Sequence, residues 1–112
     1  MGFGNMQNMQ KMMKQVQKMQ ADLARVQEEV GQRTVEASAG GGAVMATANG
    51  KGELTALRIA PAAVDPEDAE MLADLVVVAV NEALRKAHEM MAQEVGKLSP
   101  GLKGLPGLTG ME

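Results

Sequence analysis

The chain has 112 residues, a formal net charge of −3 and no cysteine. This length predicts one domain, and the lack of cysteine excludes a disulfide framework. The net acidity is not the charge of a typical nucleic-acid-binding domain. No apolar run approaches the roughly 18 residues of a membrane-spanning helix, and no signal peptide is recognisable, so we expect no membrane association.

Aromatic residues are almost absent from this composition. Hydrophobic residues make up 46% of the chain, but the only aromatic one is Phe3, and 11 residues are Met. A small core built from Met, Val, Leu and Ala is marginal on its own. We therefore expect the protein to be stabilised by forming a homo-oligomer.

Between Met9 and Val30, apolar residues recur at alternating intervals of three and four positions. The series is Met9, Met12, Val16, Met19, Leu23, Val26 and Val30. This heptad pattern predicts a helix from Asn5 or Met6 to Val30, ended by Gly31, with a narrow apolar seam that faces another helix.

Basic residues follow the opposite face of this helix. Lys11, Lys18 and Arg25 share one heptad position, and Lys14 lies beside them. The stripe spans roughly 21 Å at 1.5 Å per residue, and it offers cations to an anionic partner such as DNA phosphate. The alternative is a solvated surface that only adds solubility. The candidate DNA-binding residues are Lys11, Lys14, Lys18 and Arg25.

The middle of the chain predicts a three-stranded antiparallel meander. Alternating residues at 34–37, 43–48 and 53–59 indicate the strands, and three consecutive glycines at 40–42 separate the first two. Asn49-Gly50 indicates a hairpin with a type I′ turn, and the Lys51-Gly52 that follows leaves a bulge or a longer loop as alternatives.

A second helix is predicted from Pro66 to Lys97, with Asp65 as its N-cap. Its segment 76–80 is apolar nearly all round, so we expect that segment to be buried on more than one side. Residues 99–112 form a Gly/Leu/Pro-rich tail with Gly at every third position from Gly101. We expect one domain over 1–98 and a disordered or loosely docked tail over 99–112, with a short apolar docking motif as the alternative.

No catalytic or metal-binding pattern emerges. His88 is the only histidine, and Ala92 stands where a zinc-protease motif would place its second ligand. We expect His88 to be exposed to solvent. No second histidine or cysteine can complete a metal site. The sequence predicts no enzyme activity, no cofactor, no metal and no small-molecule substrate.

Several segments together resemble the YbaB/EbfC family of small bacterial nucleoid-associated proteins. They are the Lys/Gln/Met-rich 12–20, the Asn49-Gly50 turn, Ile59-Ala60-Pro61, the helical segments 70–76 and 81–83, and the Gly/Leu/Pro-rich tail. Ala60 departs from the family's more usual Ile-Asp-Pro, which removes a turn hydrogen bond.

The resemblance implies an α+β subunit of order α-β-β-β-α and a tweezer-like homodimer. It implies binding to double-stranded DNA with little sequence demand, roles in nucleoid organisation, DNA protection and gene regulation, and a cytoplasmic, nucleoid location. The alternative is a dimeric interaction adaptor, for example for recombination or repair proteins, in which DNA contact is incidental.

Overall fold

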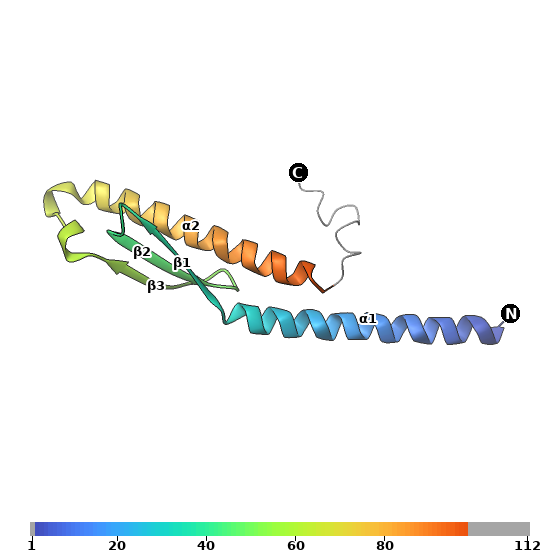
Figure 1. The fold of residues 1–112 in the computed structure, drawn as a ribbon. Coiled ribbons are helices and arrows are strands. Elements are labelled where there is room, and N and C mark those ends of the chain that lie inside the picture. Colours follow the sequence, from blue (N-terminus) through green and yellow to red (C-terminus); the bar gives the residue numbers. More distant parts are fainter. Residues whose placement is uncertain (1, 99–112) are drawn as a thin grey trace.

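The structure, a computed structural model, describes residues 2–98, with side chains from residue 6 onward. The elements are α1 (Gly2–Gly31), β1 (Thr34–Ala39), β2 (Val44–Asn49), β3 (Leu54–Ile59) and α2 (Ala69–Gly96). Figure 1 shows this order along the chain. The α-β-β-β-α fold is confirmed, and α1 begins at Gly2, somewhat earlier than expected. The predicted tail, 99–112, lies outside the described residues.

The three strands form one antiparallel sheet in the order β1-β2-β3. Val44, Ala46 and Ala48 of β2 point to one face and are fully buried. Ala79, Ala83 and Ala87 of α2 are fully buried against the same cluster. Small side chains on both elements let the helix approach the sheet closely, which is how a core without aromatics reaches dense packing.

α2 covers the sheet unevenly. It packs mainly on β1 and β2 and touches β3 little. Leu54, Leu57 and Ile59 of β3 pair with Ala48, Ala46 and Val44, so they lie on the α2 face of the sheet. All three remain exposed. The chain therefore keeps an open apolar strip beside α2.

The turn between β2 and β3 corrects one prediction. The type I′ turn at Asn49-Gly50 is wrong, because neither Asn49 nor Gly50 has the positive φ that this turn requires. The loop is longer: Gly52 has φ +84°, its N–H donates to the Asn49 carbonyl at 2.9 Å, and the Asn49 N–H donates to the Glu53 carbonyl at 2.9 Å. The longer loop, with a glycine at the positive-φ position, is the alternative that the structure confirms.

The start of the second helix also differs from the prediction. Asp65 caps a 3₁₀ turn, Pro66–Asp68, by accepting a hydrogen bond from the Glu67 N–H at 3.0 Å. Asp68 then serves as the N-cap of α2, with its Oδ1 accepting from the Met71 N–H at 3.4 Å. The predicted N-cap, Asp65, therefore caps the short 3₁₀ turn, and α2 itself begins after a second cap, Asp68.

The predicted burial of 76–80 on several sides is wrong for the single chain that the structure describes. Val77 and Val78 are 56% and 57% exposed, while Ala79 between these valines and Val80 is buried. Val76 and Val80 lie on the face of α2 that packs against the core, whereas Val77 and Val78 point away from the core.

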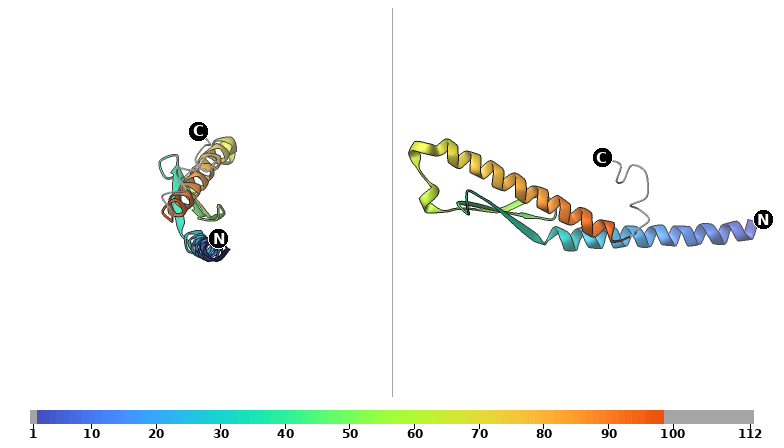
Figure 2. Two further views of the ribbon diagram at one scale, coloured as in Figure 1. Left: turned by 90° about the vertical axis from the view of Figure 1, so that its right-hand side faces the viewer. Right: turned by 45° about the horizontal axis from the view of Figure 1, so that its top comes forward.

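α1 lies almost in line with the long axis, which gives the molecule extents of 79 × 27 × 16 Å. Only its last turns are covered: Val26 and Val30 are buried, and the earlier half passes beyond the end of α2 (Figures 1 and 2). Neither helix in residues 2–98 contains an apolar stretch of the length that a membrane span needs. Because the first half of α1 is not covered by α2 or by the sheet, it extends from the fold as an exposed helical arm (Figure 1).

Candidate nucleic-acid interface

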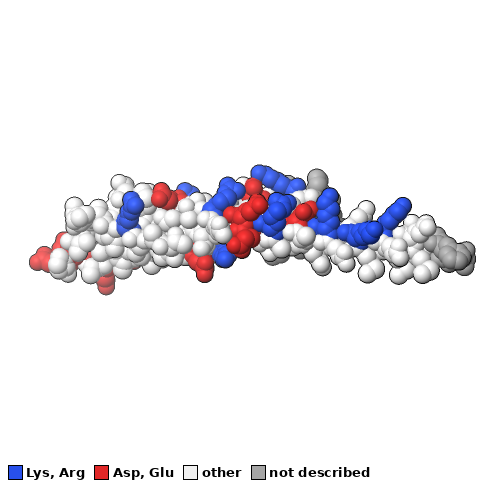
Figure 3. Space-filling view, turned by 90° about the horizontal axis from the view of Figure 1, so that it is seen from below, with Lys and Arg blue, Asp and Glu red and all other residues white. Residues whose placement is uncertain are grey.

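The uncovered part of α1, here called the α1 arm, comprises residues 6–21. It contains Lys11, Lys14 and Lys18 and no acidic residue, and every one of its residues is exposed. Figure 3 shows Lys and Arg side chains running out over this part of α1, whereas Asp and Glu gather nearer the middle of the molecule and at the opposite end. The arm is therefore a local cationic surface on a chain whose net charge is negative.

The helical spacing brings these lysines to one side. Lys11 and Lys18 are seven residues apart, which is roughly 10 Å along the helix, and Lys14 lies between them. This side is opposite the apolar seam. None of the three lysines has an ion pair among the described residues, so each can bind an external anion without first leaving a carboxylate.

Arg25, the fourth predicted DNA-binding residue, has a different environment. Its Nη2 lies 3.5 Å from the Asp22 carboxylate and its Nη1 lies 3.8 Å from that of Glu29. These pairs also give Glu29 a cationic neighbour near the C-terminus of α1, where the helix dipole disfavours an acid. The structure places Arg25 on the basic side, but next to two acids that reduce the local positive potential.

Several cations outside the arm are held within the protein. Arg85 pairs with Glu82 and Glu89. The hydrogen bond from Arg85 lowers the pKa of Glu82, and the same contact raises the pKa of Arg85. Lys86 Nζ donates to the Glu36 carbonyl at 3.0 Å. These cations are less available to DNA than the lysines of the arm.

Two further cations, Lys51 and Arg58, have no carboxylate partner in the part of the chain that the structure describes. Arg58 pairs with Met45 across the sheet and so points to the face opposite α2. The predicted set omitted both residues. The alternation of β3, with Arg58 between Leu57 and Ile59, was the available sequence signal for an outward-facing cation.

His88 is exposed, as predicted, and its Nε2 lies near Gly52. It lines a groove of about 710 Å³ between the end of α1, the β2–β3 turn and α2, together with Gln27, Lys51, Met91 and Val95. Across residues 2–98, no group of three or more His, Cys, Asp or Glu side chains could hold a metal ion. Glu28 and Lys51 are the other ionisable residues that line the groove, and neither forms an ion pair or a hydrogen bond with His88 in the part of the chain that the structure describes.

A small α-β-β-β-α fold with an exposed basic helical arm has the form of a structural DNA-binding protein. The YbaB/EbfC DNA-binding family matches residues 6–102, so the chain belongs to that family. Membership of a DNA-binding family also confirms the prediction that the protein is not an enzyme.

Related chains resemble this one over nearly their whole lengths. A nucleoid-associated protein from Moorella thermoacetica is 61% identical over 107 residues, covering 96% of this chain and 99% of its own. One from Pelotomaculum thermopropionicum is 60% identical over 101 residues, covering 90% and 95%. The crystal structure of an uncharacterized protein from Helicobacter pylori shares 26% identity at a TM-score of 0.56, covering 66% of this chain and 86% of its own.

Proposed function

We propose that the protein is a homodimer that binds double-stranded DNA through the α1 arms of both subunits, with little sequence specificity. In this role it contributes to nucleoid organisation, DNA protection and gene regulation, in the cytoplasm and on the nucleoid. The observation that carries the proposal is the set of lysines on the arm, Lys11, Lys14 and Lys18, which have no ion pair among the described residues. The relatives named nucleoid-associated proteins support the location.

The chemistry of the arm suits phosphate contacts. Lys is a compact point charge on a long flexible stem, so it follows the backbone without requiring a fixed geometry. Gln7, Gln10 and Gln17 lie on the same arm and offer amide donors to phosphate oxygens. Contacts of this kind position a protein on the duplex and carry no base information, which accounts for little sequence demand.

The open apolar strip supports a homodimer. Leu54, Leu57 and Ile59 of β3 lie beside α2 and are 37–43% exposed. Val77 lies on the same side of α2 as this strip. It precedes His88 by about three helical turns, so the two side chains point in nearly the same direction, and His88 lies at the turn that leads into β3. A second copy that covers this surface would complete a core that is marginal in one subunit. Two arms would then double the phosphate contacts.

A titration of the purified protein with unrelated duplexes over a range of salt tests the proposal. Each phosphate contact contributes about −0.9 to the slope of log K against log salt, so three lysines in each of two subunits give roughly −5 if all touch phosphate. We expect similar affinities for different sequences. An affinity that is undetectable at low salt, or independent of salt, would overturn the proposal.

The adaptor for recombination or repair proteins remains the second candidate, and one observation favours it. Met9, Met12, Met13 and Val16 form an exposed apolar face on the α1 arm, and Met-rich surfaces adapt to varied protein partners. Salt-independent or absent DNA binding by a folded dimer would favour this function over the first.

A further inference from the structure

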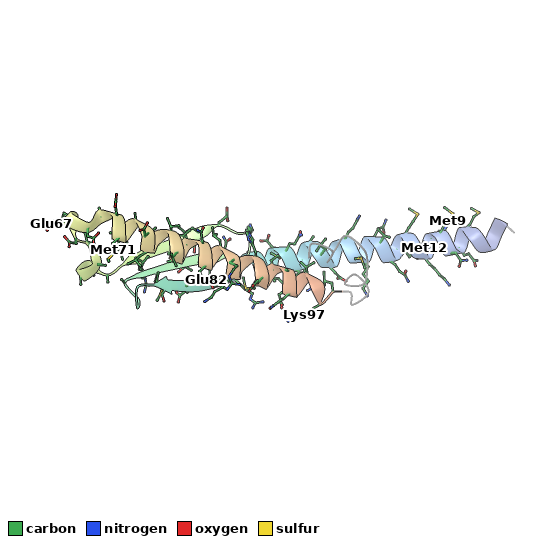
Figure 4. The ribbon with its side chains drawn as sticks, turned by 90° about the horizontal axis from the view of Figure 1, so that it is seen from above. Met9, Met12, Glu67, Met71, Glu82 and Lys97 are labelled. Atoms are coloured by element: carbon green, nitrogen blue, oxygen red, sulfur yellow. The ribbon has the colours of Figure 1, made fainter. Side chains whose placement is uncertain are left out.

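The apolar face of the α1 arm has no partner within the subunit. Its exposed residues are Met6, Met9, Met12, Met13, Val16 and Met19. Exposure falls from 64% at Met12 to 41% at Met19, and only further along, at Val26 and Val30, is the same seam buried. Figure 4 shows Met9 and Met12 on the part of α1 that continues past Lys97 at the end of α2.

The seam of the arm has the spacing that another helix requires. Met9, Met12, Val16 and Met19 continue the intervals of three and four that place Val26 and Val30 against the body. A flat surface or an extended peptide does not require this period, whereas a second helix does. The spacing therefore favours a helix as the occupant.

The residues flanking the seam favour a second copy of the same helix. The positions beside it within the arm are Met6, Asn8, Met13, Gln15 and Gln20, all uncharged. Charges at these positions normally decide which helices pair, and like charges bar self-pairing. Asp22 and Glu29 occupy the equivalent positions only outside the arm. Two identical arms can thus meet without placing like charges opposite each other at the seam.

We propose that the α1 arm pairs with the α1 arm of another dimer in an antiparallel coiled coil, so that dimers join end to end along DNA. In this arrangement Met9 packs against Met19 and Met12 against Val16 of the other copy. The inference rests on the proposed function for the dimer and for the DNA contact. In an antiparallel pair, the sheet and α2 of the two copies lie at opposite ends and do not collide. The two helix dipoles also run in opposite directions, which is the favourable arrangement for helices side by side.

The contact is weak by itself. The seam of the arm, Met9 to Met19, runs for roughly 15 Å, and two heptads bury less than the ~800 Å² per partner of a stable interface. DNA strengthens it, because neighbouring dimers held on one duplex meet at a high effective concentration. Lys11, Lys14 and Lys18 lie opposite the seam and remain free for phosphate. The consequence is cooperative coating of long DNA.

Disulfide trapping tests the contact directly, because the natural chain has no cysteine. Met9→Cys with Met19→Cys puts two thiols roughly 15 Å apart on one helix, too far to pair within a chain. On mild oxidation, we expect species heavier than a dimer by sedimentation. The matched control, Gln10→Cys with Gln17→Cys, lies off the seam and should stay dimeric. Oxidised protein that remains at the mass of a dimer would overturn the proposal.

DNA binding gives a second, independent measurement. Met12→Gln with Val16→Gln keeps the net charge and removes the apolar seam. On a duplex that accommodates one dimer, the variant should bind like the natural protein. On a duplex of several hundred base pairs, the natural protein should bind cooperatively and the variant should not. If neither the natural protein nor the variant binds the short duplex, the result contradicts the proposed DNA-binding function and not the arm–arm contact.

Two other occupants are separated by the same measurements. If truncation after Leu98 abolishes cooperative binding, the C-terminal tail holds the contact and the arm–arm proposal is wrong. If the seam variant binds long DNA as steeply as the natural protein, the apolar face serves a different protein.

Discussion

Arg33 and Glu94 join the start of the sheet to the last turns of α2: the Arg33 Nη1 atom lies 3.4 Å from Glu94 Oε1. Lys97 Nζ lies 2.6 Å from the other oxygen of the same carboxylate. Arg33 directly precedes β1, where the chain leaves α1. The carboxylate therefore helps fix the direction in which the arm leaves the body.

The first prediction is a pH dependence centred on Glu94. The hydrogen bond from Lys97, with the charges of Lys97 and Arg33, lowers the pKa of Glu94 from its ordinary 4.5. A carboxyl with a lowered folded-state pKa contributes stability above about pH 4.5, and the contribution disappears as pH falls through the folded value. Thermal unfolding at a series of pH values should show a smaller loss below pH 4.5 in Glu94→Gln than in the natural protein.

The effect should be small, because the pair is partly exposed and screened by water. Glu36→Gln removes the same charge from β1, where the Glu36 side chain has no ion pair among the described residues, and it should leave the pH profile unchanged. Identical profiles for Glu94→Gln and the natural protein would show that the contact does not contribute in solution.

The second prediction concerns Gly50, where the β2–β3 turn touches the end of α1. A Cβ at this position would lie 2.1 Å from the Val30 carbonyl oxygen, and backbone cannot move aside as a side chain can. We expect Gly50→Ala to lower the free energy of unfolding by ~1–3 kcal/mol, the usual range for overpacking. Denaturant unfolding measures this change.

Gly31→Ala is the control, since its Cβ would meet only the flexible Lys51 side chain at 3.0 Å. It should change stability by less than Gly50→Ala and could add a little helix propensity. Equal losses for the two variants would mean that the turn and the helix separate in solution.

The elements of this fold were predictable because their signals are local. The heptad series predicted α1, the alternation of apolar and polar residues predicted the strands, and Asp65-Pro66 predicted the start of α2 to within a few residues. The type I′ turn was wrong because Asn49 uses its side chain differently: its Oδ1 accepts from the N–H groups of Lys51 and Glu53. These hydrogen bonds form because Glu53 is the residue that closes the hairpin opposite Asn49. The Asn-Gly dipeptide alone does not show which residue will close it.

Burial was less predictable than secondary structure. Apolarity placed Val77 and Val78 in a core, but in the described subunit both are exposed. Which valine meets the sheet depends on how α2 lies across β1 and β2, a tertiary choice set by Ala79, Ala83 and Ala87. Likewise, the heptad position grouped Arg25 with the lysines, whereas Asp22 and Glu29 set it apart.

The third prediction tests the dimer surface with two neighbouring valines. Val77 and Val78 are almost equally exposed, at 56% and 57%, but about 100° apart around α2. Val77→Asp puts a charge on the side of β3, where we propose the second copy binds. Because the core of one subunit is marginal, we expect loss of the dimer and a lower melting temperature together.

Val78→Asp points away from that strip and should remain a folded dimer. Sedimentation and circular dichroism on both variants make the comparison. A dimer that survives Val77→Asp but dissociates with Val78→Asp would place the interface on the opposite side of α2.

The last prediction concerns the lysines of the α1 arm. Lys14→Gln with Lys18→Gln removes four charges from a dimer, so binding should weaken and the salt slope should flatten by up to ~3–4 if all four touch phosphate. The loss should be similar for unrelated DNA sequences, because phosphate contacts carry no base information. Helix propensity barely changes from Lys to Gln, so the arm should stay helical.

Arg85→Gln with Lys86→Gln removes the same number of charges from α2 and serves as the control. Arg85 is already paired with Glu82 and Glu89, and Lys86 donates a hydrogen bond to the Glu36 carbonyl, so both cations are less available to phosphate than the lysines of the arm. The control should keep nearly the natural salt slope. If it abolishes binding while the arm variant behaves like the natural protein, the DNA lies along α2, and the ion pairs of Arg85 must open when DNA binds.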